Sequence, residues 1–223
     1  AASAETITVC ADGCDYTSIN AAIGAASDGD VIQLAAETYF EGEQIDTLGK
    51  AITLRGVLDK AGDPASVLDG AGTHRVLICQ SGEAGSTVFD NLVIQNGHDE
   101  FQGGGMYNSS SSPTLTDCTF ANNIAVYFGG GVMNGASSAV FTGCSFNANQ
   151  IVVPSDLVQQ VPVPGGAGMC NHGSDVTISN CLFSQNDAGS GLGGGVQNHT
   201  SSPDLMNCVF TDNSAVDGGG MYN

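Results

Sequence analysis

Short apolar runs, separated by glycine, asparagine and serine, recur along the second half of the chain. Within each run, large apolar residues alternate with other residues, as in Cys118–Phe120 (CTF) and Cys144–Phe146 (CSF). A period of two places the apolar side chains on one face of a β-strand. The runs are short and are bounded by turn-forming residues, so the pattern predicts many short strands and few helices.

The strands belong to a repeat of about 25 residues, a period typical of one solenoid coil. Each copy opens with a glycine-rich triplet, and the copies begin at Gly103, Gly129, Gly166, Gly193 and Gly218. Stacked coils would pair as parallel strands at a spacing of about 4.8 Å. Aligning the copies gives columns of one residue type each. The columns are Asn108, Asn134, Asn171, Asn198 and Asn223; Cys118, Cys144, Cys181 and Cys208; Phe120, Phe146, Phe183 and Phe210; and Asn123, Asn149, Asn186 and Asn213.

We expect these columns to be structural. Asparagine tolerates the left-handed backbone of a sharp bend, and stacked amides can hydrogen-bond from coil to coil. The cysteine column should face the core beside the phenylalanines, and its parallel Cβ vectors favour free thiols over disulfides. The spacing CADGC allows a short disulfide between Cys10 and Cys14, whereas Cys79 and Cys170 cannot be paired from the sequence.

The first third of the chain follows a less regular version of the same plan. Residues 16–27 place Ile19, Ala22, Ile23 and Ala26 at helical spacing, which predicts a short helix that caps one end of the core. Strand-like runs follow at 31–34, 51–54, 76–78 and 88–94. We therefore interpret the chain as one domain with an N-terminal cap (1–30), irregular early coils (31–102) and regular glycine-rich repeats (103–223) that contain an insertion (150–165).

This layout resembles that of pectin-lyase-like proteins, which are right-handed parallel β-helices. The resemblance rests on the stretch from Ile7 to Gly56, which reads ITV, then YTSINAAIGAASDGDVIQLAAETYFE, then AITLRG. The later coils are similar to polymorphic outer-membrane-protein repeats, with a Gly-Gly-small-aliphatic turn at 103–106 and a Phe-x-x-Asn step at 120–123. The resemblance implies an all-β, right-handed, single-stranded parallel β-helix with a short N-terminal capping helix. Because these motifs are structural, they carry little information on activity.

The charge balance limits the partners. The chain has 23 acidic and 4 basic residues, and its formal net charge is −19. Nucleic acid is excluded because binding phosphate requires a cationic surface, and an anionic membrane would repel this chain. The acidity fits solubility in a salty medium or specific divalent-cation sites. We expect no cofactor, with calcium as the alternative.

Candidate chemistry is sparse. The resemblance implies relatives that cleave acidic polysaccharides, and lyases among them use a basic residue that the regular coils lack. Hydrolases need clustered carboxylates. The candidates are Asp90 and Asp117, aligned at equivalent positions of successive coils, with His98, Asp99 and Glu100 in the connecting loop. The alternative, which we favour, is that the aspartates are solvated turn residues and that no residue is catalytic.

Two further features are open to more than one interpretation. His172 and His199 occupy equivalent positions, and we expect solvated side chains and no metal site, with a metal site as the alternative. The insertion is apolar for a loop, so it either covers the flank of the solenoid or forms a contact surface for a partner. Asn108 and Asn198 begin glycosylation sequons, but as column residues they should be glycosylated only in part.

The start Ala1–Ala4 is small and polar, as expected after a signal-peptidase cut, and no apolar run approaches the roughly 18 residues of a membrane span. We expect an extracellular or cell-surface protein without direct membrane insertion. The favoured function is a structural or adhesive solenoid that associates through its coil ends, with itself or with further coils of a longer surface protein. A polysaccharide-active enzyme and a module binding cell-surface glycans are the alternatives.

Overall fold

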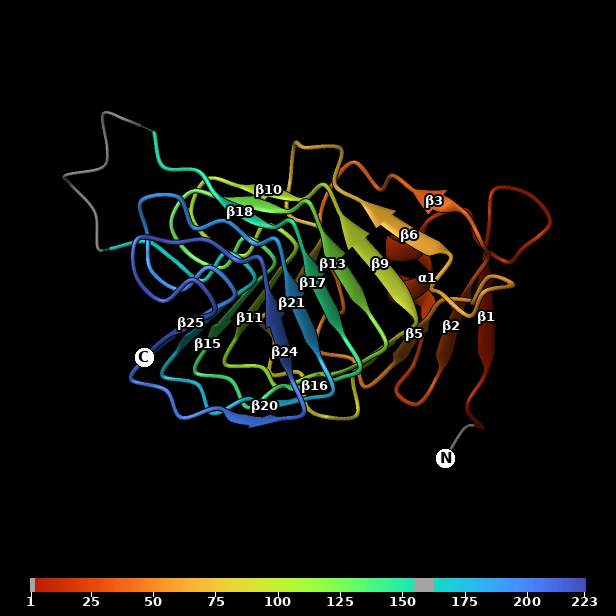
Figure 1. Cartoon of the computed structure of the whole chain (residues 1–223). Coiled ribbons are helices and arrows are strands. Elements are labelled where there is room, and N and C mark those ends of the chain that lie inside the picture. The colour runs from red at the N-terminus through yellow and green to blue at the C-terminus, as the bar shows by residue number, and fades with distance from the viewer. Residues whose placement is uncertain (1–2, 155–162) are drawn as a thin grey trace.

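The computed structural model describes residues 3–154 and 163–223. The chain winds into a parallel β-solenoid whose successive coils contribute short strands to the same stacked sheets (Figure 1). One short helix, α1 (Ile19–Ala25), lies at the N-terminal end. The predicted fold class is therefore confirmed. The part of the insertion at 155–162 lies outside the described residues, so the two interpretations of the insertion stay predictions.

Three long sheets and one small sheet form the solenoid, and here they are called sheets A to D. Sheet A contains β1 (Thr6–Val9), β2 (Val31–Leu34), β5 (Thr53–Arg55), β8 (Val88–Asp90), β12 (Thr114–Thr116), β16 (Val140–Thr142), β20 (Thr177–Ser179) and β23 (Asp204–Met206). Sheet B contains β3 (Thr38–Tyr39), β6 (Ser66–Asp69), β9 (Leu92–Gln95), β13 (Thr119–Ala121), β17 (Ser145–Asn147), β21 (Leu182–Ser184) and β24 (Val209–Thr211). Sheet C contains β4 (Ile45–Asp46), β7 (Leu77–Cys79), β11 (Met106–Ser109), β15 (Val132–Gly135), β19 (Met169–His172), β22 (Val196–His199) and β25 (Met221–Tyr222). Sheet D contains β10 (His98–Asp99), β14 (Ile124–Ala125) and β18 (Gln150–Ile151).

The run predicted as one strand at 88–94 is two strands in different sheets. Asn91 separates β8 from β9 with a φ of 56°. Asparagine adopts this left-handed conformation more readily than most residues. The single residue turns the chain from sheet A into sheet B, and residues 117, 143, 180 and 207 have positive φ at the same corner of later coils.

Stacked aromatic rings fill the core behind sheet B. Phe146 lies between Phe120 and Phe183, with ring centroids 5.1 and 4.5 Å apart and nearly parallel planes. All three side chains have no exposed surface. The cysteines of the column are buried beside them except Cys208, which is partly exposed in the last complete coil. Core packing of this kind requires the strict register that the structure shows, with Phe120 opposite Phe146.

Two asparagine ladders run along the solenoid. In the first, Asn108 Nδ2 donates to Asn134 Oδ1 over 2.8 Å, and the same bond repeats through Asn171 and Asn198 to Asn223. In the second, the side chains of Asn123, Asn149, Asn186 and Asn213 are linked in the same way. The expected left-handed backbone at these asparagines is wrong. The left-handed residues are neighbours such as Ser110 and Asn122, because the ladder asparagines must point their amides inward from extended backbone.

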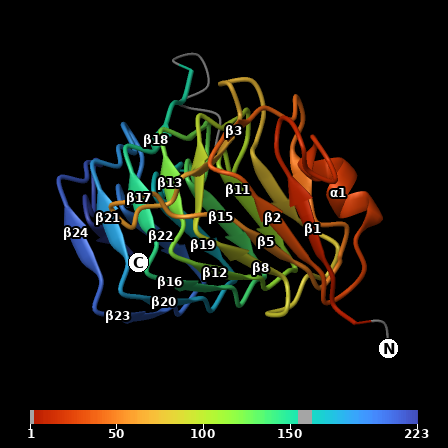
Figure 2. The ribbon, with the colours of Figure 1, turned by 90° about the vertical axis from the view of Figure 1, so that its right-hand side faces the viewer.

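The helix closes one end of the core (Figure 2). Ile19, Ala22 and Ile23 are buried against the first coil. Ser18 caps the helix N-terminus and Glu41 accepts hydrogen bonds from the backbone N–H of Ile19. At the other end, Lys50 Nζ donates to three carbonyl oxygens, those of residues 23, 24 and 26. A carboxylate at the N-terminus and an ammonium at the C-terminus both complement the helix dipole.

Candidate functional site

The structure corrects the alignment of the predicted carboxylates. The alignment of Asp90 with Asp117 is wrong by one residue: Asp90 pairs with Thr116, and Asp117 stands at the left-handed corner with a φ of 49°. Asp90 Oδ2 also accepts from Arg55 Nε over 2.9 Å, so this carboxylate is engaged in an ion pair.

The connecting loop carries the other candidates, and it is organised by Arg75. Asp99 Oδ2 lies 2.7 Å from Arg75, and Asp99 Oδ1 accepts from the backbone of Phe101 and Gln102. Burial lowers the pKa of Arg75, and Asp99 opposes that shift. His98 lies in β10 with a partly buried side chain, and Glu100 is exposed. Asp90 and Asp99 are therefore each held in an ion pair with an arginine, and the hydrolase alternative stays a prediction.

A buried carboxylate that the sequence did not single out is also structural. Glu83 accepts hydrogen bonds from Thr47, Ser111 and the backbone of residues 49 and 81. Burial raises the pKa of Glu83, but the hydrogen bonds outweigh burial and the net effect is a lowered pKa. Glu83 therefore stays charged and hydrogen-bonds its own turn to the turns of the coils on both sides.

The cysteines divide into one disulfide and a set of thiols. Cys10 and Cys14 form a disulfide, with their Cα atoms 5.5 Å apart. Burial raises the pKa of Cys170 to about 12. Hydrogen bonding to neighbouring thiols, together with burial, raises the pKa of Cys144 and Cys181. Protonated, buried thiols are poor nucleophiles, so Cys144 and Cys181 act as core residues, whereas Cys170 lies on the outer face of sheet C.

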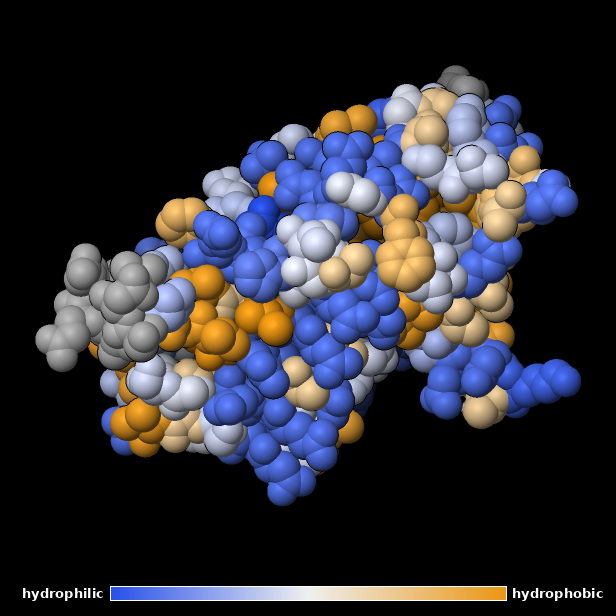
Figure 3. Space-filling model, turned by 90° about the horizontal axis from the view of Figure 1, so that it is seen from above, coloured by the Kyte–Doolittle hydropathy of each residue, from blue (hydrophilic) through white to orange (hydrophobic). Residues whose placement is uncertain are grey.

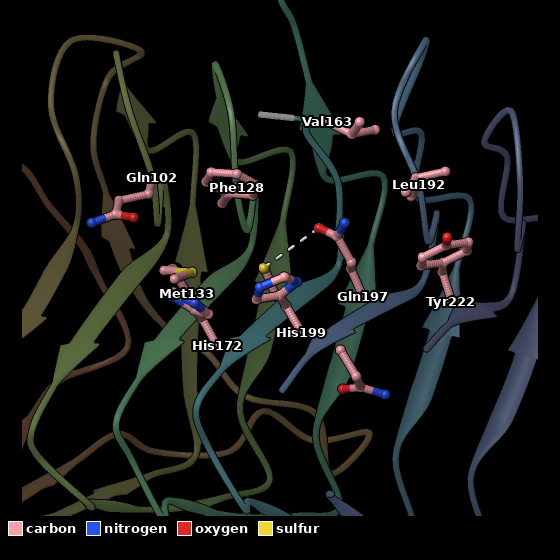
Figure 4. A pocket seen from close by; sticks show the side chains of 11 residues that line it. Gln102, Phe128, Met133, Val163, His172, Leu192, Gln197, His199 and Tyr222 are labelled. Atoms are coloured by element: carbon pink, nitrogen blue, oxygen red, sulfur yellow. Dashed lines mark hydrogen bonds between the residues drawn. The ribbon is translucent and has the colours of Figure 1, made fainter. Parts of the chain in front are cut away.

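A cavity of about 500 Å³ lies against the outer face of sheet C (Figure 4). Its floor is formed by Met133, Cys170 and Gln197, which stand level on β15, β19 and β22 and point away from the core. Tyr222 of β25 continues the same row. The Cys170 thiol donates a hydrogen bond to Gln197 Oε1 over 3.6 Å, which orients the Gln197 amide within the floor.

A row of bridged residues, one from each coil, runs along the cavity. The residue before each glycine triplet forms a bridge to its counterpart in the next coil, and the resulting row runs Gln102, Phe128, Gly165, Leu192 and Asp217. Phe128 and Leu192, which lie on either side of Gly165 in this row, both line the cavity. A Cβ at Gly165 would clash with the carbonyl oxygen of Leu192, so only glycine fits there.

The two histidines lie at the mouth of the same cavity. His172 and His199 are opposite each other on β19 and β22, and their ring centroids are 4.9 Å apart. Both side chains are exposed, and Gly135 takes the equivalent place on β15, which leaves space beside His172. In Figure 4 His172 and His199 lie next to each other, below Met133 in this view. Through residues 3–154 and 163–223, no group of three or more His, Cys, Asp or Glu side chains is placed to hold a metal ion.

Most of the cavity residues were missed from the sequence. The signal that could have found them is the residue before each glycine triplet, where Phe128 and Leu192 flank the small Gly165.

Seen from above, the molecular surface is largely hydrophilic, with apolar side chains interspersed among polar ones (Figure 3). In the described part of the chain, no helix is long and apolar enough to cross a bilayer.

Comparison with known proteins identifies the family. Residues 72–222 match the family model described as a right-handed beta helix region. The chain belongs to this family. The matched part of this right-handed β-helix includes the second asparagine ladder, the first ladder except Asn223, and the described lining of the sheet C cavity. No curated protein matches the chain.

Proposed function

We propose that the protein is an extracellular structural or adhesive β-solenoid whose coils associate end to end. The observation that carries the proposal is the strict register of the coils, in which asparagine ladders and stacked phenylalanine rings repeat along the solenoid as a rigid scaffold requires. α1 covers the N-terminal end of the core, and at the other end β23, β24 and β25 are the last strands that this sequence contributes to sheets A, B and C. An unpaired parallel edge is a template for a further strand.

The side chains at this edge support association. Leu205, Cys208 and Phe210 pack on the core but are only partly buried, unlike their counterparts in earlier coils. Asn213 and Asn223 end the two ladders, so a further coil could continue both rows of amides. Another coil in register would bury these groups as the internal coils bury theirs.

Three observations support a role outside the cell. The disulfide between Cys10 and Cys14 is typical of an oxidising compartment. The net charge of −19 favours solubility and disfavours nucleic acid and anionic membranes as partners. The resemblance of the coils to polymorphic outer-membrane-protein repeats also favours a cell-surface protein, with further coils or surface glycans as partners.

Light scattering over a concentration series tests the proposal, with a variant in the edge and a matched control. We expect the average mass to rise with concentration for the wild type and for Val209→Lys, whose side chain is 56% exposed on the outer face of β24. Phe210→Lys, which places a charge at the open end of the core, should abolish the rise. A wild-type chain that stays monomeric at the highest concentration refutes end-to-end association. Release of reducing ends or unsaturated products from a polysaccharide panel would favour the enzyme alternative.

A further inference from the structure

The lining of the sheet C cavity defines an uncharged site. Its described residues include no Lys, Arg, Asp or Glu side chain. A charged ligand would lose its hydration in such a site without gaining a partner of opposite charge. With a net charge of −19 on the chain, an anionic ligand is disfavoured further. The chemistry therefore selects a neutral molecule.

The floor and walls favour an aromatic ring. Met133 and Cys170 supply sulfur atoms that are almost fully buried, with 5% and 2% of their residue surface exposed. Sulfur makes favourable contacts with the edges of aromatic rings. Phe128 and Tyr222 add aromatic walls, against which a planar ring can stack or pack edge to face.

The mouth supplies hydrogen bonds on one side. The imidazoles of His172 and His199 stand together there, and Gln197 turns its amide oxygen toward Cys170. A neutral imidazole has one donor and one acceptor nitrogen, so it can accept from a hydroxyl group. A ligand with an apolar ring and one hydroxyl on its edge would satisfy both halves of the cavity.

We propose that this cavity binds a small, uncharged phenolic compound, with its ring between Phe128 and Leu192 and its hydroxyl group on the His172–His199 pair. The volume of about 500 Å³ accommodates one or two fused rings. The proposal does not depend on the association of coil ends, because the floor strands β15, β19 and β22 are internal to sheet C.

The test uses the full chain and two matched probes, 2-naphthol and naphthalene, which differ by the hydroxyl group. Fluorescence titration should show saturable, one-to-one binding of 2-naphthol with a Kd on the order of 100 μM, within the range expected of small ligands. Phe128→Ala should weaken both probes by about tenfold, because it removes an aromatic wall. His172→Ala combined with His199→Ala should weaken 2-naphthol by about fivefold and leave naphthalene unchanged.

Phe40→Ala is the control, since Phe40 is a solvent-exposed aromatic that lines a different, shallow cleft. This variant should bind both probes as the wild type does. Leu192→Ala serves as a second wall variant if Phe128→Ala does not fold, as judged by circular dichroism. The proposal is overturned if 2-naphthol does not saturate, if both wall variants bind as tightly as the wild type, or if the histidine variant weakens the two probes equally.

Discussion

Replacing Phe146 with alanine should destabilise the protein more than almost any other single change in the regular coils. The side chain has no exposed surface and is stacked between Phe120 and Phe183, with a third ring, Phe141, edge-on at 6.0 Å. Truncating a buried phenylalanine typically costs about 3–5 kcal/mol. Each aromatic pair lost adds roughly 0.5–1.5 kcal/mol beyond the buried area, so we expect the upper part of the 3–5 kcal/mol range.

Ser145→Ala provides the matched control. Ser145 precedes Phe146 on β17, and its side chain is on the outer face of sheet B with intermediate exposure. Its loss should change the free energy of unfolding by less than about 0.5 kcal/mol.

Equilibrium urea unfolding, followed by circular dichroism, measures both variants. Because each coil contacts only its neighbours, hydrogen exchange in β13 and β21 should report the same loss locally. Equal shifts for the two variants, or a shift below about 1 kcal/mol for Phe146→Ala, would contradict the inward stacking of this column.

Three further predictions concern the polar core. Asn149→Ala should cost about 3 kcal/mol or more, because the buried amide bonds to the coils on both sides and its loss leaves several unpaired groups; Asn147→Ala, which loses one partly exposed bond to a serine, should cost less than about 1 kcal/mol in the same urea melts. Because the pKa of Glu83 is lowered in the folded state, its charge stabilises the fold above the ordinary pKa of 4.5, and this contribution is lost as the pH falls below that value. The free energy of unfolding of Glu83→Gln should therefore decline less with acid than that of the wild type, and parallel pH profiles of the two free energies would count against the assignment. Expressed in a glycosylating host, Asn108 and Asn198 should be modified at most in part, since both amides are engaged in the ladder, and an intact mass with full occupancy at both would show that the ladder does not form before modification.

The sequence alone determined the solenoid and most of its internal order. A two-residue alternation between glycine-rich turns leaves one apolar face per short strand, and a repeat of about 25 residues leaves stacking as the way to bury that face. Once coils stack in register, Asn134 must lie beside Asn108 and Asn171, so the ladder follows from the alignment. The helix was also readable, because Ile19, Ala22 and Ile23 share one face.

Only the tertiary structure decided what the surface does. The register of the irregular coils depends on where a left-handed residue turns the chain, and Asn91 placed Asp90 one position away from the alignment with Asp117. The ion pairs of Asp90 and Asp99 join residues of different coils, so the sequence could not show that these carboxylates are engaged. The sheet C cavity is lined by Phe128 and Leu192, which lie in coils on either side of Gly165, and by floor residues from three neighbouring strands. Such a cavity forms only when neighbouring coils pack around it. That packing joins residues far apart in the chain.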